Sequence, residues 1–418
     1  MSRDHTHFHL FDGLRAVAAT AVFGLHIWYI MGFGDLGHAV DVVGVQGLMG
    51  IADVMLNLGY LGVALFFVIS AFLLYRPFYR ARIYGHRRPN LKSYFIRRAV
   101  RILPAYWVAL TIIGLLDNHS DLFTWHGFVG WYLLTFIYSD GSFILNQILP
   151  AWTICVEASF YVFLPLWSLF AARIARNSKN PFRVELLSLA VLAASSVVWK
   201  LVVLHNLVGP DTAKRGMIVL PASLDVFAAG MALAVVSVRY EEQIRSGELS
   251  AALRSGALWW VAALIGYGAM CALVDGRSVF GGDPHAAILL ISLMKIPICI
   301  AIAIPAVFGP GTSERRAGPV RDLLGSKPVQ WVGKVSYGLY LWHIFVIMHL
   351  KKGGPFGITP LFPNAAIELL PIVALVAYQL SLAIAAVSWR LIERPAMHRG
   401  RRLARRVEQE SSAPVAAA

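Results

Sequence analysis

The feature that most constrains this chain is a series of apolar stretches, each long enough to cross a lipid bilayer as a helix. Such a helix needs about 20 mostly apolar residues. Only 14% of the 418 residues are charged, whereas soluble domains carry about a quarter. We predict an all-α polytopic membrane protein with about ten transmembrane helices, because helices satisfy their own backbone hydrogen bonds in lipid. The expected spans are 10–31, 59–76, 102–117, 150–171, 184–207, 217–238, 256–275, 286–308, 329–350 and 366–392.

The basic residues give these spans an orientation. Most Arg and Lys residues lie in alternate connections, which a cytoplasmic N-terminus would place inside the cell: 77–101, 172–183, 239–255, 309–328 and the tail after 392. Short cytoplasmic loops of membrane proteins carry such an excess of positive charge. We therefore predict that both termini are cytoplasmic. The net charge of +14 is then a matter of topology, and we expect no nucleic-acid partner.

Three further segments need an interpretation. The apolar segment 128–138 is short, and counting it as a span would place the basic loop 172–183 outside, so we expect it to be re-entrant or interfacial. We interpret 36–58 as an amphipathic helix on the outer surface. The membrane domain should cover 1–398, and 399–418 should be a basic, then disordered, cytoplasmic tail. The first apolar stretch lacks the cleavage pattern of a signal peptide.

Ionisable residues inside spans are costly and mark candidate sites. Asp12 and Arg15 lie three residues apart and can form an ion pair on one helix face. His26 follows Arg15 by about three turns, so both point the same way. Counting helical rise, His26, Glu157 and His343 reach a similar depth from three different spans. This coincidence suits a general base with an orienting carboxylate, or else a buried polar network that holds three helices together.

Other polar residues allow two readings each. Ser336 and Tyr340 form a stripe with His343 on the ninth span. Ser70 lies at mid-membrane, where back-bonding to its own helix would explain it. A basic cluster stands at the entrance of the third span, where guanidinium groups suit phosphate, although topology alone would explain their charge; it comprises Arg97, Arg98 and Arg101. No ligand cluster indicates a metal site, and the three cysteines have no close partners.

Six stretches, taken in order, resemble the acyltransferase-3 family of integral membrane acyltransferases: FDGLRAVAATAVFGLHI, GYLGVALFFVISAFLL, RRAVRILPAYW, WTICVEASFYVFLP, GKVSYGLYLWH and WRLIERP. The family includes bacterial polysaccharide O-acetyltransferases. The resemblance implies a ten-helix domain in the bacterial inner membrane. It also implies transfer of an acyl group, such as acetyl or succinyl, from cytoplasmic acyl-CoA to a hydroxyl of a cell-surface glycan, glycolipid or related acceptor. Acyl-CoA would be a substrate, and no permanently bound cofactor is implied.

The resemblance also implies roles for particular residues. His26 matches the family's first-helix histidine, Arg15 its partner arginine, and Glu157 the glutamate of a WSLxxE pattern. Arg98 and Arg101 match an RxxR pair on the acyl-CoA side. This chain departs from the family where SGF reads Ser70-Ala71-Phe72 and where Thr153 and Ile154 replace Ser and Leu. None of these departures touches a proposed catalytic side chain. We expect no fused esterase-like domain.

The resulting hypothesis names His26 as the base, with Glu157 and Arg15 beside it, and places the CoA phosphates on the basic cluster. The expected substrate-binding residues are Asp12, Ser70, Ser336, Tyr340 and His343. Two other classes compete: a lipid or proton-coupled transporter, against which the lack of inverted repeats argues, and a non-catalytic scaffold. The sequence leaves open the acyl group, the acceptor, covalent or direct transfer, and the oligomeric state.

Overall fold

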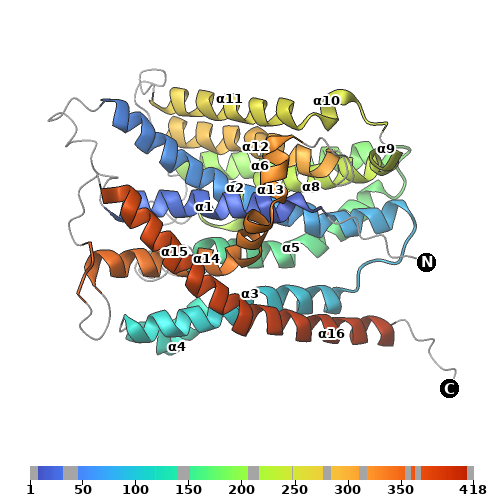
Figure 1. Ribbon diagram of the computed structural model, residues 1–418. Helices are drawn as coiled ribbons and strands as arrows, with labels where there is room; N and C mark the ends of the chain where they lie inside the picture. The colour runs from blue at the N-terminus through green and yellow to red at the C-terminus, as the bar shows by residue number, and fades with distance from the viewer. Residues whose placement is uncertain are drawn as a thin grey trace.

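The computed structural model describes residues 8–31, 46–117, 119–138, 151–205, 216–246, 248–275, 284–309, 318–353, 359–362 and 369–411. These residues form helices and turns, with no strand among them. Figure 1 shows most of the long helices lying side by side, with α15 crossing the bundle obliquely. The long helices are α1 (Leu10–Ile30), α2 (Gln46–Ile83), α3 (Leu91–Leu116), α5 (Ala151–Ala175), α6 (Pro181–Leu204), α8 (Leu224–Arg239), α11 (Gly256–Asp275), α12 (Pro284–Phe308), α14 (Lys327–Lys352), α15 (Leu370–Ser388) and α16 (Arg394–Glu410).

The number of long apolar helices confirms a polytopic membrane protein. Within the described ranges, nine helical segments are long and apolar enough to cross a bilayer, and each coincides with an expected span. The remaining expected span, 329–350, is α14, whose 26 residues are also long enough to cross. Helix α14 is less apolar because much of its surface, including Gln330, Ser336 and His343, is buried by neighbouring helices instead of lipid.

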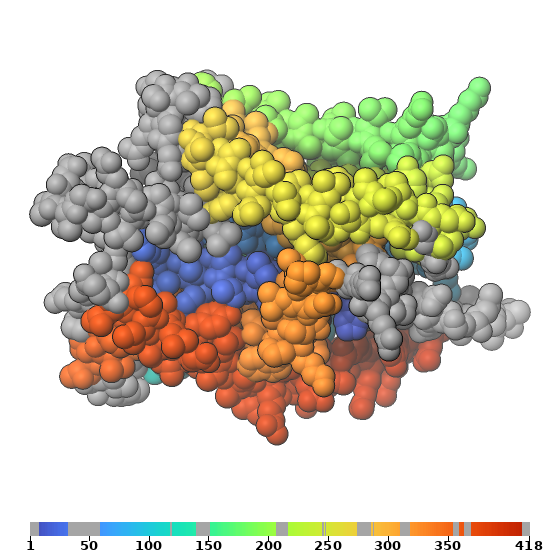
Figure 2. Space-filling model, turned by 45° about the horizontal axis from the view of Figure 1, so that its top comes forward, coloured from blue at the N-terminus to red at the C-terminus, as the bar shows by residue number. Residues whose placement is uncertain are grey.

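Helix α1 lies at the centre of the bundle between α2 and α14. In Figure 2 most of its visible dark blue surface forms a band between the yellow of α11 and the orange and red of the C-terminal helices. Glycines allow the close approach on both sides. A Cβ atom on Gly62 of α2 would lie 2.6 Å from the carbonyl oxygen of Ala18, and one on Gly333 of α14 would lie 1.8 Å from that of Asp12.

Two helices extend further than the sequence predicted. Helix α2 begins at Gln46, so residues 46–58 continue the second span instead of forming a separate surface helix; residues 36–45 lie outside the described ranges. Helix α3 begins at Leu91, where the side chain of Asn90 caps it by accepting a hydrogen bond from the backbone N–H of Ser93. The long inner loop expected at 77–101 is therefore mostly helical.

The apolar segment 128–138 is not a spanning helix. It folds as short irregular turns, η3 (Phe128–Tyr132) and η4 (Phe136–Tyr138), directly after the short helix α4 (Trp125–Gly127). Its backbone is held against α3, because Tyr106 and Trp107 donate side-chain hydrogen bonds to the carbonyl oxygens of residues 131 and 132, at 2.9 and 2.8 Å. Its expected re-entrant or interfacial placement in the membrane stays a prediction.

The two ends of the described chain lie at the same end of the bundle. The guanidinium of Arg76, near the end of α2, stacks on the ring of Phe8 just before α1. At the start of α3, Ser93 and Arg97 donate to the carboxylate of Glu408 in α16, at 2.7 and 2.8 Å. Helix α16 thus packs along α3, and the basic part of the expected tail is helical through residue 410. Residues after 411 are outside the described ranges.

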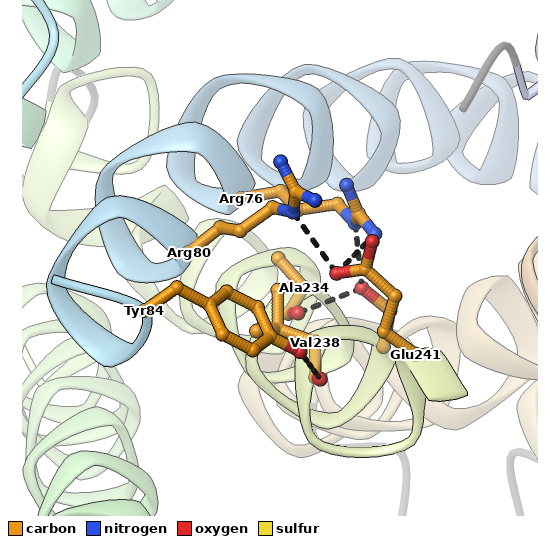
Figure 3. Close-up of polar contacts among 7 residues, drawn as sticks. Arg76, Arg80, Tyr84, Ala234, Val238 and Glu241 are labelled. Carbon is orange, nitrogen blue, oxygen red and sulfur yellow. Dashed lines mark hydrogen bonds and ion pairs between the residues drawn. The ribbon is translucent and has the colours of Figure 1, made fainter. Parts of the chain in front are cut away.

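A cluster of ion pairs joins α2 to α8 and α9 (Glu241–Ser246) at this end. Figure 3 shows Arg76 and Arg80 pointing toward Glu241, with N–O distances of 3.3 and 3.0 Å. Arg76 also donates to the hydroxyl of Ser237 at 3.1 Å. Because the cluster links three helices through charge-assisted hydrogen bonds, we interpret these two arginines as structural.

Candidate active site

A polar cavity lies inside the bundle, between α1, α2, α3, α5 and α14. Its wall combines apolar side chains, such as Val63 and Phe66, with ionisable ones. Seven of the residues singled out from the sequence line it: Arg15, Ser70, Arg98, Arg101, Glu157, Ser336 and Tyr340. The structure thus brings most of the predicted site together from five helices that are far apart in sequence.

The cavity has more positive than negative charge. Arg15, Arg98 and Arg101 line it, and Glu157 is the acidic residue of its lining. Arg15 forms an ion pair with Asp12 at 2.9 Å. Within the described part of the chain, neither Arg98 nor Arg101 has a carboxylate partner, and the Arg98 Nε is buried without a hydrogen bond. Both arginines are half-buried, and the Arg98 guanidinium lies over the Tyr161 ring, 5.8 Å from its centroid. Cationic groups that line a cavity without a carboxylate partner are suited to receive an anion.

Arg97 occupies a different surface from its neighbours. Consecutive helical residues point about 100° apart, so Arg98 faces the cavity while Arg97 faces α16 and pairs with Glu408 at 2.8 Å. The sequence analysis had grouped Arg97 with Arg98 and Arg101 as one basic cluster. In the structure only Arg98 and Arg101 line the cavity.

Glu157 lies beside Ser70 and Tyr161 and makes no contact with His26. Ser70 donates a hydrogen bond to its Oε1 at 2.5 Å, and Tyr161 donates to the same oxygen at 2.7 Å. Ser70 therefore bonds across helices instead of back to its own helix. The Glu157 carboxylate faces α2 and the cavity, so a similar depth along its helix does not bring it to His26. The predicted alignment of Glu157 with His26 is not present.

His26 contacts His343 instead. The Nδ1 of His26 lies 3.0 Å from the Nε2 of His343, which joins α1 to α14 as their depths had predicted. Tyr340 lies beside His343, with ring centroids 5.9 Å apart, and its hydroxyl lies 2.6 Å from that of Thr153 at the cavity wall. The histidine pair therefore lies behind Tyr340, which is itself part of the cavity lining.

The remaining hydroxyl group of the stripe is already engaged. Ser336 donates to the carbonyl oxygen of Gly333 at 2.8 Å, so its proton is directed to its own helix. Tyr161 is a cavity residue that the sequence analysis missed. The sequence did contain a signal for it, because Tyr161 follows Glu157 by four residues and lies on the same helix face.

The bundle and its cationic cavity define a polytopic membrane protein with an internal polar site. The sequence model described as an acyltransferase domain matches residues 8–390 of this chain. The chain therefore belongs to the acyltransferase-3 family. No solved structure shows a significant match to it.

Two relatives show how far the similarity extends. The peptidoglycan O-acetyltransferase OatA of Listeria monocytogenes is 23% identical over 411 residues, which cover 93% of this chain and 56% of that protein. Nodulation protein 10 of Rhizobium leguminosarum is 28% identical over 424 residues, covering 95% of both chains. This chain therefore spans about half of the first relative and nearly all of the second.

Proposed function

We propose that this protein is an O-acyltransferase that takes an acyl group from cytoplasmic acyl-CoA and passes it to a hydroxyl of a cell-surface glycan or glycolipid. The observation that carries the proposal is the pair Arg98 and Arg101, which have no carboxylate partner within the described residues and line a cavity that adjoins a histidine pair. A CoA thioester has the complementary chemistry: anionic phosphates, a long flexible arm and a reactive carbonyl.

The arginines would bind the phosphates at the end of the bundle where the described chain begins and ends. Arg98 and Arg101 lie in the second and third turns of α3, and a guanidinium can donate two parallel hydrogen bonds to one phosphate. Arg15 faces the same cavity from α1. From Arg15 the chain rises 11 residues to His26, about 16 Å, a distance that the extended arm of acyl-CoA would cross past Tyr340.

His26 would act as the general base. It would remove the proton of the acceptor hydroxyl while that oxygen attacks the thioester carbonyl. The new C–O ester bond forms, the C–S bond breaks, and the proton passes from His26 to the departing thiolate of CoA. Base assistance of this kind contributes about 10²–10⁴-fold to a rate. Glu157 would offset part of the cavity's positive charge and hold Ser70 and Tyr161 in place, which is a different role from orienting His26.

The acceptor and the cellular location of the protein are inferred from its relatives and from its membrane topology. The Listeria relative is named a peptidoglycan O-acetyltransferase, which favours a cell-envelope glycan as acceptor and acetyl as acyl group. Its chain is much longer than the matched region, so a glycolipid acceptor agrees equally with the present bundle. Both relatives are bacterial, and we place the protein in the bacterial inner membrane.

Turnover of acyl-CoA by the purified protein in nanodiscs tests the proposal. Wild type should release CoA from acetyl- or succinyl-CoA in the presence of an envelope glycan extract and label that extract. His26→Ala should lose about 10²–10⁴-fold of this rate while retaining the wild-type melting temperature. Absence of acyl-CoA consumption and binding by the folded wild-type protein would contradict the proposal and favour a transport role.

A further inference from the structure

His343 is a fully buried histidine that the proposed reaction does not use. It lies on α14, and the residue is only 1% exposed. Its Nδ1 lies 2.8 Å from the carbonyl oxygen of Tyr340 and 3.2 Å from that of Leu339. Its Nε2 lies 3.0 Å from the Nδ1 of His26. Both ring nitrogens of His343 are thus engaged, one with its own backbone and the other with His26.

These contacts determine where the protons of both rings lie. A carbonyl oxygen can only accept, so the Nδ1 of His343 must bear hydrogen, and in the neutral ring its Nε2 is then an acceptor. The Nδ1 of His26 must therefore be the donor between the two rings. The carbonyl oxygen of Val22, 2.9 Å from the same atom, requires the same assignment. The lone pair of neutral His26 is consequently on Nε2, which has no partner among the described residues.

We propose that His343 is a positioning residue for His26. This inference rests on the proposed function, in which His26 Nε2 takes the acceptor proton. His343 fixes the ring plane of His26 and accepts a stronger hydrogen bond from its Nδ1–H once His26 becomes an imidazolium. In serine hydrolases a carboxylate fulfils this role. Here a neutral imidazole does so, and no proton is transferred from His343, because its own hydrogen stays directed at the carbonyl oxygens.

The surroundings explain why this partner is a histidine. Glu157, the carboxylate expected from the sequence to orient His26, is engaged by Ser70 and Tyr161. Phe23 and Tyr340 lie next to the His343 ring, with centroids 6.3 and 5.9 Å away. A carboxylate between these aromatic rings would carry an uncompensated buried charge, whereas a neutral ring with both nitrogens hydrogen-bonded would not.

Two substitutions of His343 test the inference: one keeps a hydrogen-bond acceptor without the ring, and the other keeps a ring without the acceptor. His343→Gln can place its Oε1 near the former Nε2 and still accept from His26. His343→Phe keeps the ring and removes the acceptor. His349→Gln, elsewhere on α14 and paired with Asp117, is the matched control. Each variant is purified in nanodiscs, checked for its melting temperature, and assayed for kcat and KM with acetyl-CoA.

We expect His343→Phe to lower kcat at least about tenfold, a fraction of the full base contribution, with little change in the KM for acetyl-CoA. His343→Gln should recover most of that loss, and the control should match wild type. Equal kcat for His343→Phe and wild type, or an equal defect in His343→Gln and His343→Phe, would overturn the inference while leaving the proposed function in place.

A second measurement does not depend on turnover. Nitrogen-15 NMR of histidine-labelled protein reports which ring nitrogen bears hydrogen, and the His26 signals are assigned by their loss in His26→Ala. We expect both His26 and His343 to be Nδ1–H tautomers in the resting state. A hydrogen on Nε2 of His343 would refute the inference. This result can be obtained whether or not the protein consumes acyl-CoA, so it is independent of the test of the proposed function.

Discussion

At the scale of single residues, the sequence predicted which residues belong to the site better than it predicted which of them contact one another. The sequence indicated His26, His343 and Glu157 because ionisable groups in spans are costly. Helical rise brought the two histidines to the same depth, and they are in contact in the structure. It wrongly paired Glu157 with His26, because a similar depth does not determine which neighbours a side chain faces, and Glu157 faces Ser70 and Tyr161.

Arg97 and Arg101 of α3 provide a prediction at this scale. Arg101→Lys keeps the charge in the cavity but loses the planar fork that binds phosphate. We expect its KM for acyl-CoA to rise about tenfold or more, since a hydrogen bond to a charged group contributes ~1.5–3 kcal/mol. Arg97→Lys should change KM little, because Arg97 pairs with Glu408 away from the cavity. Kinetics of both variants at equal folded fraction make the comparison. Equal effects of the two substitutions would show that the cavity does not hold the phosphates.

At the scale of helices, the apolar pattern predicted nearly every spanning element but not its full length. Helices α2 and α3 extend beyond their apolar cores, because caps such as Asn90 and contacts between helices, rather than hydropathy, determine where they end. The sequence could not show that α14 packs closely against α1 and α15. Its polar residues lower its hydropathy, yet Ser336 lines the cavity and His343 contacts α1.

The contact between α1 and α14 allows a matched test. A Cβ atom on Gly333 would lie 1.8 Å from the backbone oxygen of Asp12, whereas one on Gly24 would have no atom within 4 Å. Gly333→Ala should therefore destabilise the bundle by about 1–3 kcal/mol or more. Gly24→Ala should be neutral or stabilise by up to ~1 kcal/mol through helix propensity. Thermal unfolding in detergent measures both. A Gly333→Ala protein as stable as wild type would contradict this packing of the two helices.

At the scale of the whole molecule, the charge pattern predicted an orientation that remains to be measured. The structure shows that the described chain begins and ends at one end of the bundle, as an even number of spans requires. The excess of basic residues in alternate loops predicts that this end faces the cytoplasm.

Cysteine labelling tests this orientation. His86 and Asp121 are exposed residues beyond the two opposite ends of α3. In a chain whose three buried native cysteines are replaced by alanine, His86→Cys should react with an impermeant maleimide only after the cells are opened. Asp121→Cys should react from outside in cells with a permeable outer layer. The reverse pattern would place the cavity arginines at the outer face, away from cytoplasmic acyl-CoA.

The central claim is that acyl-CoA occupies the cavity with its phosphates on the arginines and its thioester beside His26. The most direct test is a cryo-EM structure of His26→Ala in nanodiscs with a non-hydrolysable acetyl-CoA analogue. We predict density for the phosphates against Arg98 and Arg101, and for the arm passing Tyr340 toward position 26. An empty cavity at saturating analogue, or an analogue bound elsewhere on the bundle, would contradict the account.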